Sequence, residues 1–452
     1  MKFLIVLVLL TSPSLWAQST NKNYAEQIRF PVTKWKLDNG LEILVHEDYS
    51  TPLVSFHQWY RVGSRNEKPG MTGIAHFFEH LMFKGTQNFS SEDFEHLIQS
   101  NGGTNNAFTS YDYTGYYVDL PASKIDIIFQ MESDRMTNLL FDPVSIQKER
   151  EVVKEERRLR FDNSISGSMN EATFSSVFKV HPYKWPVIGF MKDLNAITLD
   201  QFREFYRTYY SPNNSILVVV GAVSAKKIKE LAEKYYAKIP AQKIPESHIP
   251  EEPEQKGQRS VVIKKDVQTP YFTLAYKSVK AGHSDQYAFD LLSNVLSEGP
   301  SSRLYKRLVY KEQLVSSIYS YAYTPKDPGI FSITGAMKPD VNLQKALTSI
   351  NSEIYKLRTE KVSAKELIKA KHQVVKTYVD ALKTVSGKAR AIATNEILFG
   401  NYEVMFEDIN KYLSVTEEDI LRVAKTYLQP RKRSLIRVLP TENNKKTAMN
   451  NN

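Results

Sequence analysis

Apolar and polar residues follow one another along the chain in a pattern that predicts the same order of elements twice. Each half opens with a β-prone segment containing Thr-Pro, at 51–56 and 269–274, and an amphipathic helix follows, at 71–84 and 284–296. Each half then continues with β-rich runs, a long charged helix, and a closing helix with a final strand. In the first half these are 104–120, 144–161, 199–210 and 215–220, and in the second 314–336, 364–382, 417–427 and 434–438.

Strands and helices that are mixed, rather than strictly alternating, predict the α+β class. The repeated order predicts two homologous lobes, each a mostly antiparallel sheet packed with helices. Between them, residues 239–260 are rich in Pro, Glu, Gln and Lys and contain few large apolar side chains, which is typical of a linker. We therefore expect an N-terminal lobe over 25–238 and a C-terminal lobe over 261–445.

The first residues have the layout of a secretory signal peptide, which we place at 1–17. Lys2 precedes an apolar run at 3–10, and cleavage is predicted after Ala17. The apolar run is too short to form a stable membrane span. The chain has no cysteine, so it forms no disulfide and carries no lipid on Cys. These features predict a periplasmic protein, with secretion as the alternative.

Charge and composition narrow the class of protein only a little. Hydrophobic residues make up 42% of the chain, which is ordinary for a globular protein with full cores. The formal net charge of +10 is spread along the sequence, and no nucleic-acid motif accompanies it. We expect a weak preference for acidic surfaces and no nucleic-acid partner.

The predicted helix at 71–84 carries three ionisable residues, His76, Glu79 and His80, among Ile, Phe, Leu and Met. Burying such groups without partners costs free energy, so hydrogen bonds or a metal ion must satisfy them. His76 and His80 are four residues apart and project from one face of a helix, where both can bind one ion. Imidazole nitrogens suit Zn²⁺, and Glu79 on the neighbouring edge is placed to act as a general base. The alternative, two core histidines hydrogen-bonded to backbone, does not explain the adjoining glutamate.

A catalytic zinc site takes three protein ligands, so we expect a third ligand on another element. The charged segment 148–158 offers Glu149 and Glu156, which are seven residues apart and project from one helical face, within about 20°. We assign Glu156 as the ligand and Glu149 as the carboxylate that orients a histidine or the water. Four further charged residues, in this segment or just after it, are expected to form a solvated face: Glu151, Glu155, Arg158 and Arg160.

The stretch HFFEHLMFKGT, followed 69 residues after His80 by EREVVKEE, resembles the pitrilysin–insulinase metallopeptidases, whose signature is His-x-x-Glu-His. The likeness is greatest to their short members, similar to mitochondrial processing peptidase subunits, and it covers nearly the whole mature chain. It implies one zinc ion per chain, held by His76, His80 and Glu156, with Glu79 as catalytic base and Glu149 in support. It also implies that two bilobed halves form a clamshell, of which this chain is one.

The run 101–110, NGGTNNAFTS, is also similar to the substrate strand of this family. Polar, glycine-led and β-prone, it could form a sheet edge whose free N–H and C=O groups pair with an extended peptide. Asn106, Ala107 and Phe108 are the residues we expect to bind substrate, the first two nearest the scissile bond. The alternative is an ordinary hairpin strand.

One departure from the family concerns the second half. The resemblance implies an Arg and a Tyr seven residues apart that hold the substrate carbonyl, and Val309 and Ser316 occupy those positions. Neither side chain donates the expected charge or phenol. We therefore expect either a homologous partner subunit that supplies the pair, in a heterodimer, or a homodimer that works without it.

The function favoured by these residues is an exported zinc-dependent endopeptidase that acts on peptides or unfolded segments. One alternative is a non-catalytic scaffold or assembly subunit of the same fold, which would be expected to lack metal ligands or the base. Another is a zinc-storage protein, which would need neither Glu79 nor an edge strand.

Overall fold

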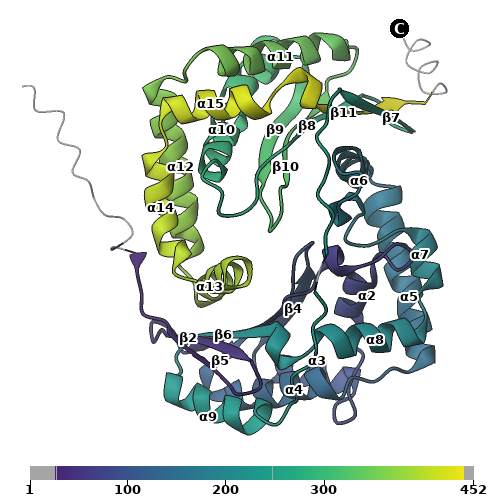
Figure 1. Ribbon diagram of the computed structural model, residues 1–452, viewed down its shortest axis with the longest axis vertical. Coiled ribbons are helices and arrows are strands. Elements are labelled where there is room, and N and C mark those ends of the chain that lie inside the picture. Colours follow the sequence, from purple (N-terminus) through teal and green to yellow (C-terminus); the bar gives the residue numbers. More distant parts are fainter. Residues whose placement is uncertain (1–25, 27, 247, 442–452) are drawn as a thin grey trace, which may run out of the picture.

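The computed structural model describes residue 26 and residues 28–246 and 248–441, and shows two lobes, one above the other in Figure 1. The predicted signal peptide, 1–17, lies outside the described residues. The first lobe contains strands β1 (Thr33–Lys36), β2 (Glu42–Glu47), β3 (Leu53–Tyr60), β4 (Thr104–Thr109), β5 (Thr114–Pro121) and β6 (Ser215–Gly221). Its main helices are α2 (Ile74–Leu81), α3 (Ser91–Ser100), α4 (Ile125–Thr137), α5 (Pro143–Arg157), α6 (Ile165–Val177), α7 (Met191–Ala196), α8 (Leu199–Tyr209) and α9 (Ala225–Tyr236).

The second lobe is built from five strands and six α-helices within the part of the chain described here. The strands are β7 (Arg259–Lys265), β8 (Tyr271–Lys277), β9 (Val315–Tyr323), β10 (Ile330–Met337) and β11 (Ser434–Pro440). The helices are α10 (Gln286–Ser297), α11 (Leu343–Thr359), α12 (Ala364–Ala381), α13 (Val385–Phe399), α14 (Val404–Ser414) and α15 (Glu417–Tyr427).

The two sheets have the same strand order, which confirms the prediction of homologous α+β lobes. The first sheet runs β1-β2-β6-β3-β5-β4 and the second β7-β11-β8-β10-β9. In each, one pair is parallel, β2 with β6 and β7 with β11, and all other neighbours are antiparallel. Strand β1 is the single addition to the first copy, and β4 and β9 are corresponding edge strands.

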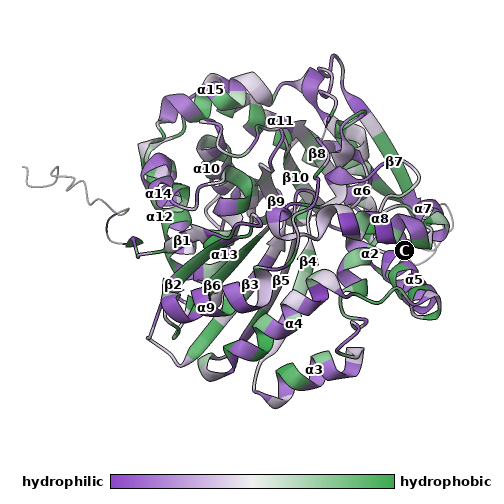
Figure 2. Cartoon of the chain, turned by 60° about the horizontal axis from the view of Figure 1, so that its bottom comes forward, coloured by the Kyte–Doolittle hydropathy of each residue, from purple (hydrophilic) through white to green (hydrophobic). Residues whose placement is uncertain are grey.

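Apolar side chains of the first sheet and of α2, α4, α8 and α9 form the main core of the first lobe. Figure 2 shows the apolar residues concentrated along the strands of this sheet, with polar residues on the outer faces of the helices. The separation follows the amphipathic pattern from which the helices were predicted.

Several predicted boundaries differ from the structure. The helix predicted over 71–84 is α-helical only at 74–81, and the one predicted over 144–161 continues beyond α5 as a π-helical turn, η3 (Arg158–Asp162). The described residues between α9 and β7 form no helix or strand, and Arg259 and Ser260, which we had placed in the linker, begin β7. None of the described helices is both long and apolar enough to cross a membrane.

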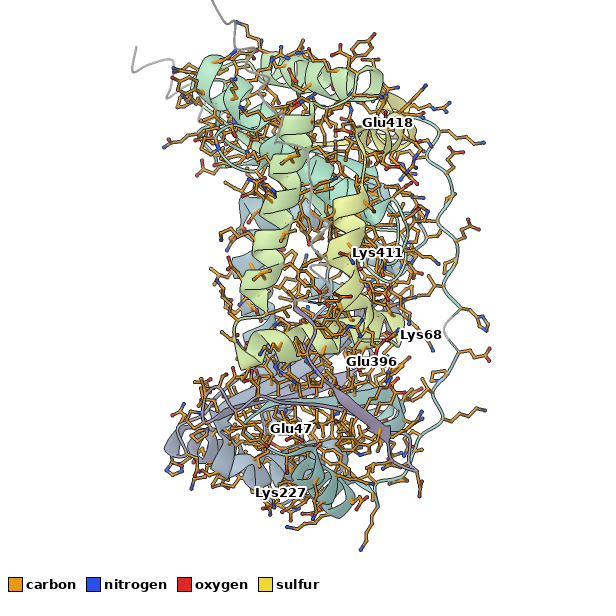
Figure 3. The ribbon with its side chains drawn as sticks, turned by 90° about the vertical axis from the view of Figure 1, so that its left-hand side faces the viewer. Glu47, Lys68, Lys227, Glu396, Lys411 and Glu418 are labelled. Carbon is orange, nitrogen blue, oxygen red and sulfur yellow. The ribbon has the colours of Figure 1, made fainter. Side chains whose placement is uncertain are left out.

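The lobes contact each other through α13 of the second lobe. This helix packs against the first sheet, on the face opposite to the one that the helices of the first lobe cover. Ile392 and Ala393 of α13 belong to one buried cluster with Trp59 of β3 and Val218 of β6. Glu396 of α13, labelled in Figure 3, is fully buried and accepts a hydrogen bond of 2.7 Å from Lys34 Nζ on β1. A helix of the second half therefore completes the core of the first.

Replacing Ile392 by alanine is expected to lower the free energy of unfolding by about 2–5 kcal/mol, because it leaves a cavity between the lobes. Denaturant titration followed by tryptophan fluorescence measures this loss. Ile368→Ala on α12, where the side chain is 52% exposed, is the control and should change stability by less than about 0.5 kcal/mol. Equal losses in the two variants would contradict the proposed packing.

Candidate metal centre and active site

Helix α2 begins at a position that only glycine can occupy. Gly73 precedes the helix with φ of +90°, and a Cβ there would lie 2.4 Å from the carbonyl oxygen of Ile188. The buried carboxylate of Glu67 accepts hydrogen bonds from the N–H groups of Gly73 (2.9 Å) and Ala75 (3.0 Å). This side chain satisfies donors that a helix start leaves unpaired, so the first turn of α2 is fixed against the rest of the lobe.

The sequence of α2 divides it into an apolar face and an ionisable face. Ile74, Phe77, Phe78 and Leu81 are buried in the core, at spacings of three and four residues. His76, Glu79 and His80 lie on the other face, and each is only partly buried. The helix therefore presents two imidazoles and one carboxylate toward α5 and β4.

Helix α5 brings two carboxylates to those imidazoles. His80 Nδ1 lies 2.8 Å from Glu149 Oε1, and His80 Nε2 lies 3.2 Å from Glu156 Oε2. His76 Nε2 is 3.7 Å from the same oxygen of Glu156. The ligand atoms of His76, His80 and Glu156 all lie within 4.8 Å of one another. The structure thus brings together the three residues predicted to bind metal, with Glu149 behind His80.

The histidines and carboxylates strongly perturb one another's pKa values. Burial lowers the pKa of His80, but the contacts with Glu149 and Glu156 outweigh it and raise that pKa to about 9. Burial lowers the pKa of His76 to about 4. The contact with His80 holds the pKa of Glu156 below its ordinary value. A positive charge at His80 is therefore stabilised by the carboxylates of Glu149 and Glu156.

These residues fit a divalent cation of the zinc type. Glu156 Oε2 is buried, and among the described residues no donor of good geometry bonds to it. The Nε2 atoms of both histidines converge on this oxygen, and two nitrogens with one carboxylate oxygen are ligands that Zn²⁺ accepts. In the neutral imidazole, donation from Nδ1 of His80 to Glu149 leaves the lone pair on Nε2, the atom that faces Glu156 and can bind the ion.

Glu79 lies beside the candidate ligands and contacts a different element. Its Oε2 accepts a hydrogen bond of 2.6 Å from Thr109 Oγ1, at the end of β4. Burial raises the pKa of Glu79, although the Thr109 hydrogen bond opposes this effect. A raised pKa is what a carboxylate needs to exchange a proton near neutral pH.

Three contacts in the site were not predicted from the sequence. Lys84 Nζ lies 2.5 Å from Glu149 Oε2, and Arg160 Nε lies 3.0 Å from Glu156 Oε1. Arg160 is 70% exposed, in agreement with its predicted place on a solvated face, but its pairing with Glu156 was missed; Glu155 and Arg158 pair with each other at the surface. The four-residue spacings His80–Lys84 and Glu156–Arg160 were the available signal. Nothing in the sequence indicated the contact of Thr109.

The predicted substrate residues lie on β4, which is the edge of the first sheet and pairs on one side with β5. The side chain of Asn106 is exposed, and its Oδ1 accepts a hydrogen bond of 2.8 Å from the N–H of Ala107. Phe108 lies two residues further along the strand and therefore on the same face of the sheet as Asn106, where it packs against Trp59 and lies 4.9 Å from the guanidinium of Arg390.

The two arginines that precede Val309 most closely in the sequence are already paired with carboxylates. Val309 is packed against the core of the second lobe, and the exposed Ser316 is the second residue of β9. Arg303 pairs with Glu366, and Arg307 pairs with Glu312 and Glu353. These arginines therefore support the second lobe.

Comparison with known proteins identifies the family. Residues 42–189 match Insulinase (Peptidase family M16), and residues 196–374 match Peptidase M16 inactive domain. Zinc protease PqqE of Helicobacter pylori is 33% identical over 399 residues, covering 87% of this chain and 89% of the relative. The uncharacterized zinc protease YmxG of Bacillus subtilis is 27% identical, covering 87% and 95%. The chain belongs to the pitrilysin–insulinase family of metallopeptidases, whose named members indicate zinc use.

Solved structures share the fold. A protease from Helicobacter pylori superposes with a TM-score of 0.86 and 31% identity, covering 91% of this chain and 100% of that one. The periplasmic protease PqqL of Escherichia coli has a TM-score of 0.76 and 21% identity, covering 92% of this chain and 48% of that one. The present fold therefore corresponds to about half of the larger protein.

Glu149→Gln is expected to weaken zinc binding about 10- to 100-fold, because the amide no longer holds His80 as firmly as the carboxylate does. Competition with a chromophoric chelator measures the affinity. Glu151→Gln on the same helix, where the side chain is 54% exposed, is the control and should bind zinc as the unmodified protein does. Unchanged affinity in Glu149→Gln would show that this carboxylate does not support the site.

Proposed function

We propose that this protein is a zinc-dependent endopeptidase that hydrolyses peptides or unfolded segments. The proposal is carried by the convergence of His76, His80 and Glu156 beside a carboxylate, Glu79, that is not one of the three. Membership of a metallopeptidase family supports it, as do the relatives named zinc proteases.

His76, His80 and Glu156 would hold the ion, which when bound supplies a Lewis acid that polarises the scissile carbonyl and makes water more acidic. Glu79 accepts the proton of the attacking water and then donates it to the leaving amine. Thr109 fixes the orientation of the Glu79 carboxylate during both transfers. Glu149 keeps His80 in the tautomer that leaves Nε2 available.

The free edge of β4 is proposed to bind the substrate backbone as an added strand. Thr109, at one end of β4, contacts the proposed base, so a peptide paired with this edge would pass directly beside Glu79. In this structure the N–H of Ala107 donates to the side-chain oxygen of Asn106. A carbonyl oxygen of the substrate would replace that side chain as the acceptor. Backbone pairing is tolerant of sequence, which suits an enzyme that accepts many unfolded segments.

We also propose that the protein works outside the cytoplasm and within a two-chain assembly. The signal-like segment 1–17 supports export to the periplasm, with secretion as the alternative. The correspondence to about half of the periplasmic protease PqqL supports a second bilobed unit. That unit is a homologous subunit carrying the Arg and Tyr absent at Val309 and Ser316, or a second copy of this chain.

A non-catalytic scaffold is the second candidate function, and the match of 196–374 to a domain described as inactive favours it. That segment contains none of the residues of the candidate centre. All of them lie within 42–189, the part that matches the insulinase description. The two functions therefore differ in what Glu79 does, and substitution of Glu79 separates them.

Glu79→Gln is expected to lower kcat for an unstructured fluorogenic peptide by about 10²–10⁴-fold, because an amide accepts no proton from water. Zinc content, measured by elemental mass spectrometry, should stay near one ion per chain, because Glu79 is not one of the proposed ligands. Glu155→Gln, an exposed carboxylate of α5, is the control and should retain activity. Absence of hydrolysis by the unmodified protein, alone and with a bilobed homologue, would favour the scaffold.

Peptides methylated at single backbone nitrogens test the proposed role of β4. Methylation at alternate positions near the scissile bond should lower kcat/KM at least tenfold, because those N–H groups would pair with the edge strand. Methylation at the intervening positions should have little effect, since alternate groups of a strand point away from its neighbour. A uniform response along the peptide would contradict pairing with β4.

A further inference from the structure

A cavity of 1160 Å³ lies between the lobes, where the open face of the second sheet meets α6 and η3 of the first lobe. Its walls come from β8, β9 and β10 on one side and from residues 159–174 on the other. Alternate residues of β9 point into it, because side chains of a strand alternate between its faces. These are Ser317, Tyr319, Tyr321 and Tyr323.

Most of the side chains that line the cavity are aromatic, aliphatic or hydroxyl-bearing, and very few are charged. Tyr271 of β8 and Phe161 of η3 add to the tyrosines of β9, and Ser332 and Thr334 of β10 add hydroxyl groups. Among the described residues that line the cavity, Arg160 is the one with a charged side chain, and no carboxylate is present. Such walls favour apolar and aromatic groups and offer no counter-ion to a cation.

The aromatic side chains continue from one lobe into the other. Tyr321 stacks on Tyr323 with 6.3 Å between ring centroids, and Tyr323 lies 6.0 Å from Tyr111. Tyr111 in turn stacks on Phe174 of α6 at 5.0 Å. The aromatic surface is thus continuous from β9 to α6.

The cavity adjoins the candidate metal centre at two points. Ser110 and Tyr111 of its lining directly follow Thr109, which donates to Glu79. Arg160, also in the lining, contacts Glu156 on the oxygen that faces away from the histidines. A chain that passes Glu79 along β4 would therefore enter this cavity.

We propose that the cavity binds the substrate segment next to the scissile bond and selects aromatic or bulky apolar side chains while rejecting lysine and arginine. This proposal rests on the proposed endopeptidase function. An aromatic side chain would stack on the Tyr319–Tyr323 face of β9, and the lining hydroxyls would bond to the peptide backbone. A basic side chain would be desolvated beside Arg160 without an acidic partner.

Binding without cleavage tests the cavity. Fluorescein-labelled, unstructured peptides that differ at one central residue, Phe, Leu or Lys, are titrated by anisotropy into zinc-loaded Glu79→Gln protein. The Phe and Leu peptides should bind at least tenfold more tightly than the Lys peptide. The double variant Tyr319→Ser, Tyr321→Ser should weaken binding of the Phe peptide at least fivefold and leave the weaker Lys peptide unchanged.

Tyr310→Ser on η6 (Tyr305–Lys311) is the matched control, because this tyrosine is 76% exposed and does not line the cavity. Tyr319 and Tyr321 are 53% and 54% exposed, so their replacement should not unfold the lobe. Equal affinity for the Phe and Lys peptides, or unchanged affinity after removal of both tyrosines, would overturn the proposal. The expected preference in a protein that hydrolyses nothing would support the cavity and refute the endopeptidase.

Discussion

The whole candidate centre depends on the position of α5 relative to α2, because the two helices supply all its ligands. Glu149 and Glu156 face α2, and the residues that follow them, Arg150 and Arg157, fix α5 from a neighbouring face. Arg150 donates to the carbonyl oxygen of Ile197 at 2.7 Å, and Arg157 donates to that of Gly189 at 2.8 Å. The segment at Ile188 and Gly189 is also the one that packs against Gly73 at the start of α2. Both helices are thus held by the same part of the chain, so a shift of one moves the other.

The two lobes show how one fold can serve two purposes. Both sheets have the same strand order and corresponding edge strands, β4 and β9. In the first lobe the edge strand ends beside the ionisable face of α2. In the second, α10 takes the place of α2 and is largely apolar, with Leu291, Leu292 and Val295 in the core. None of the described residues of the second lobe belongs to the centre. This lobe instead provides a tyrosine-lined sheet face that faces the first lobe, and a helix, α13, that completes the core of the first lobe.

The fold class, the duplicated order of elements, and the shared helical face of His76 with His80 and of Glu149 with Glu156 could be predicted because each rests on a regular spacing. Apolar residues at helical or strand periods set the elements, and residues four or seven apart share a helical face. Contacts without such a period were missed. Thr109 reaches Glu79 only because β4 lies beside α2. Arg160 could have been found from its four-residue spacing to Glu156, but a charged helix has many such pairs, and most of them face solvent.

The sequence by itself determined which side chains can bind a metal ion and which helices carry them, since helix geometry alone fixes the relation of His76 to His80 and of Glu149 to Glu156. Only the tertiary structure decided that these two helices meet, that Phe108 is packed against Trp59, and that the tyrosines of β9 line a cavity between the lobes. The physical reason is that these contacts join residues distant in sequence. Packing of the two cores sets their distances, and no local period in the chain records them.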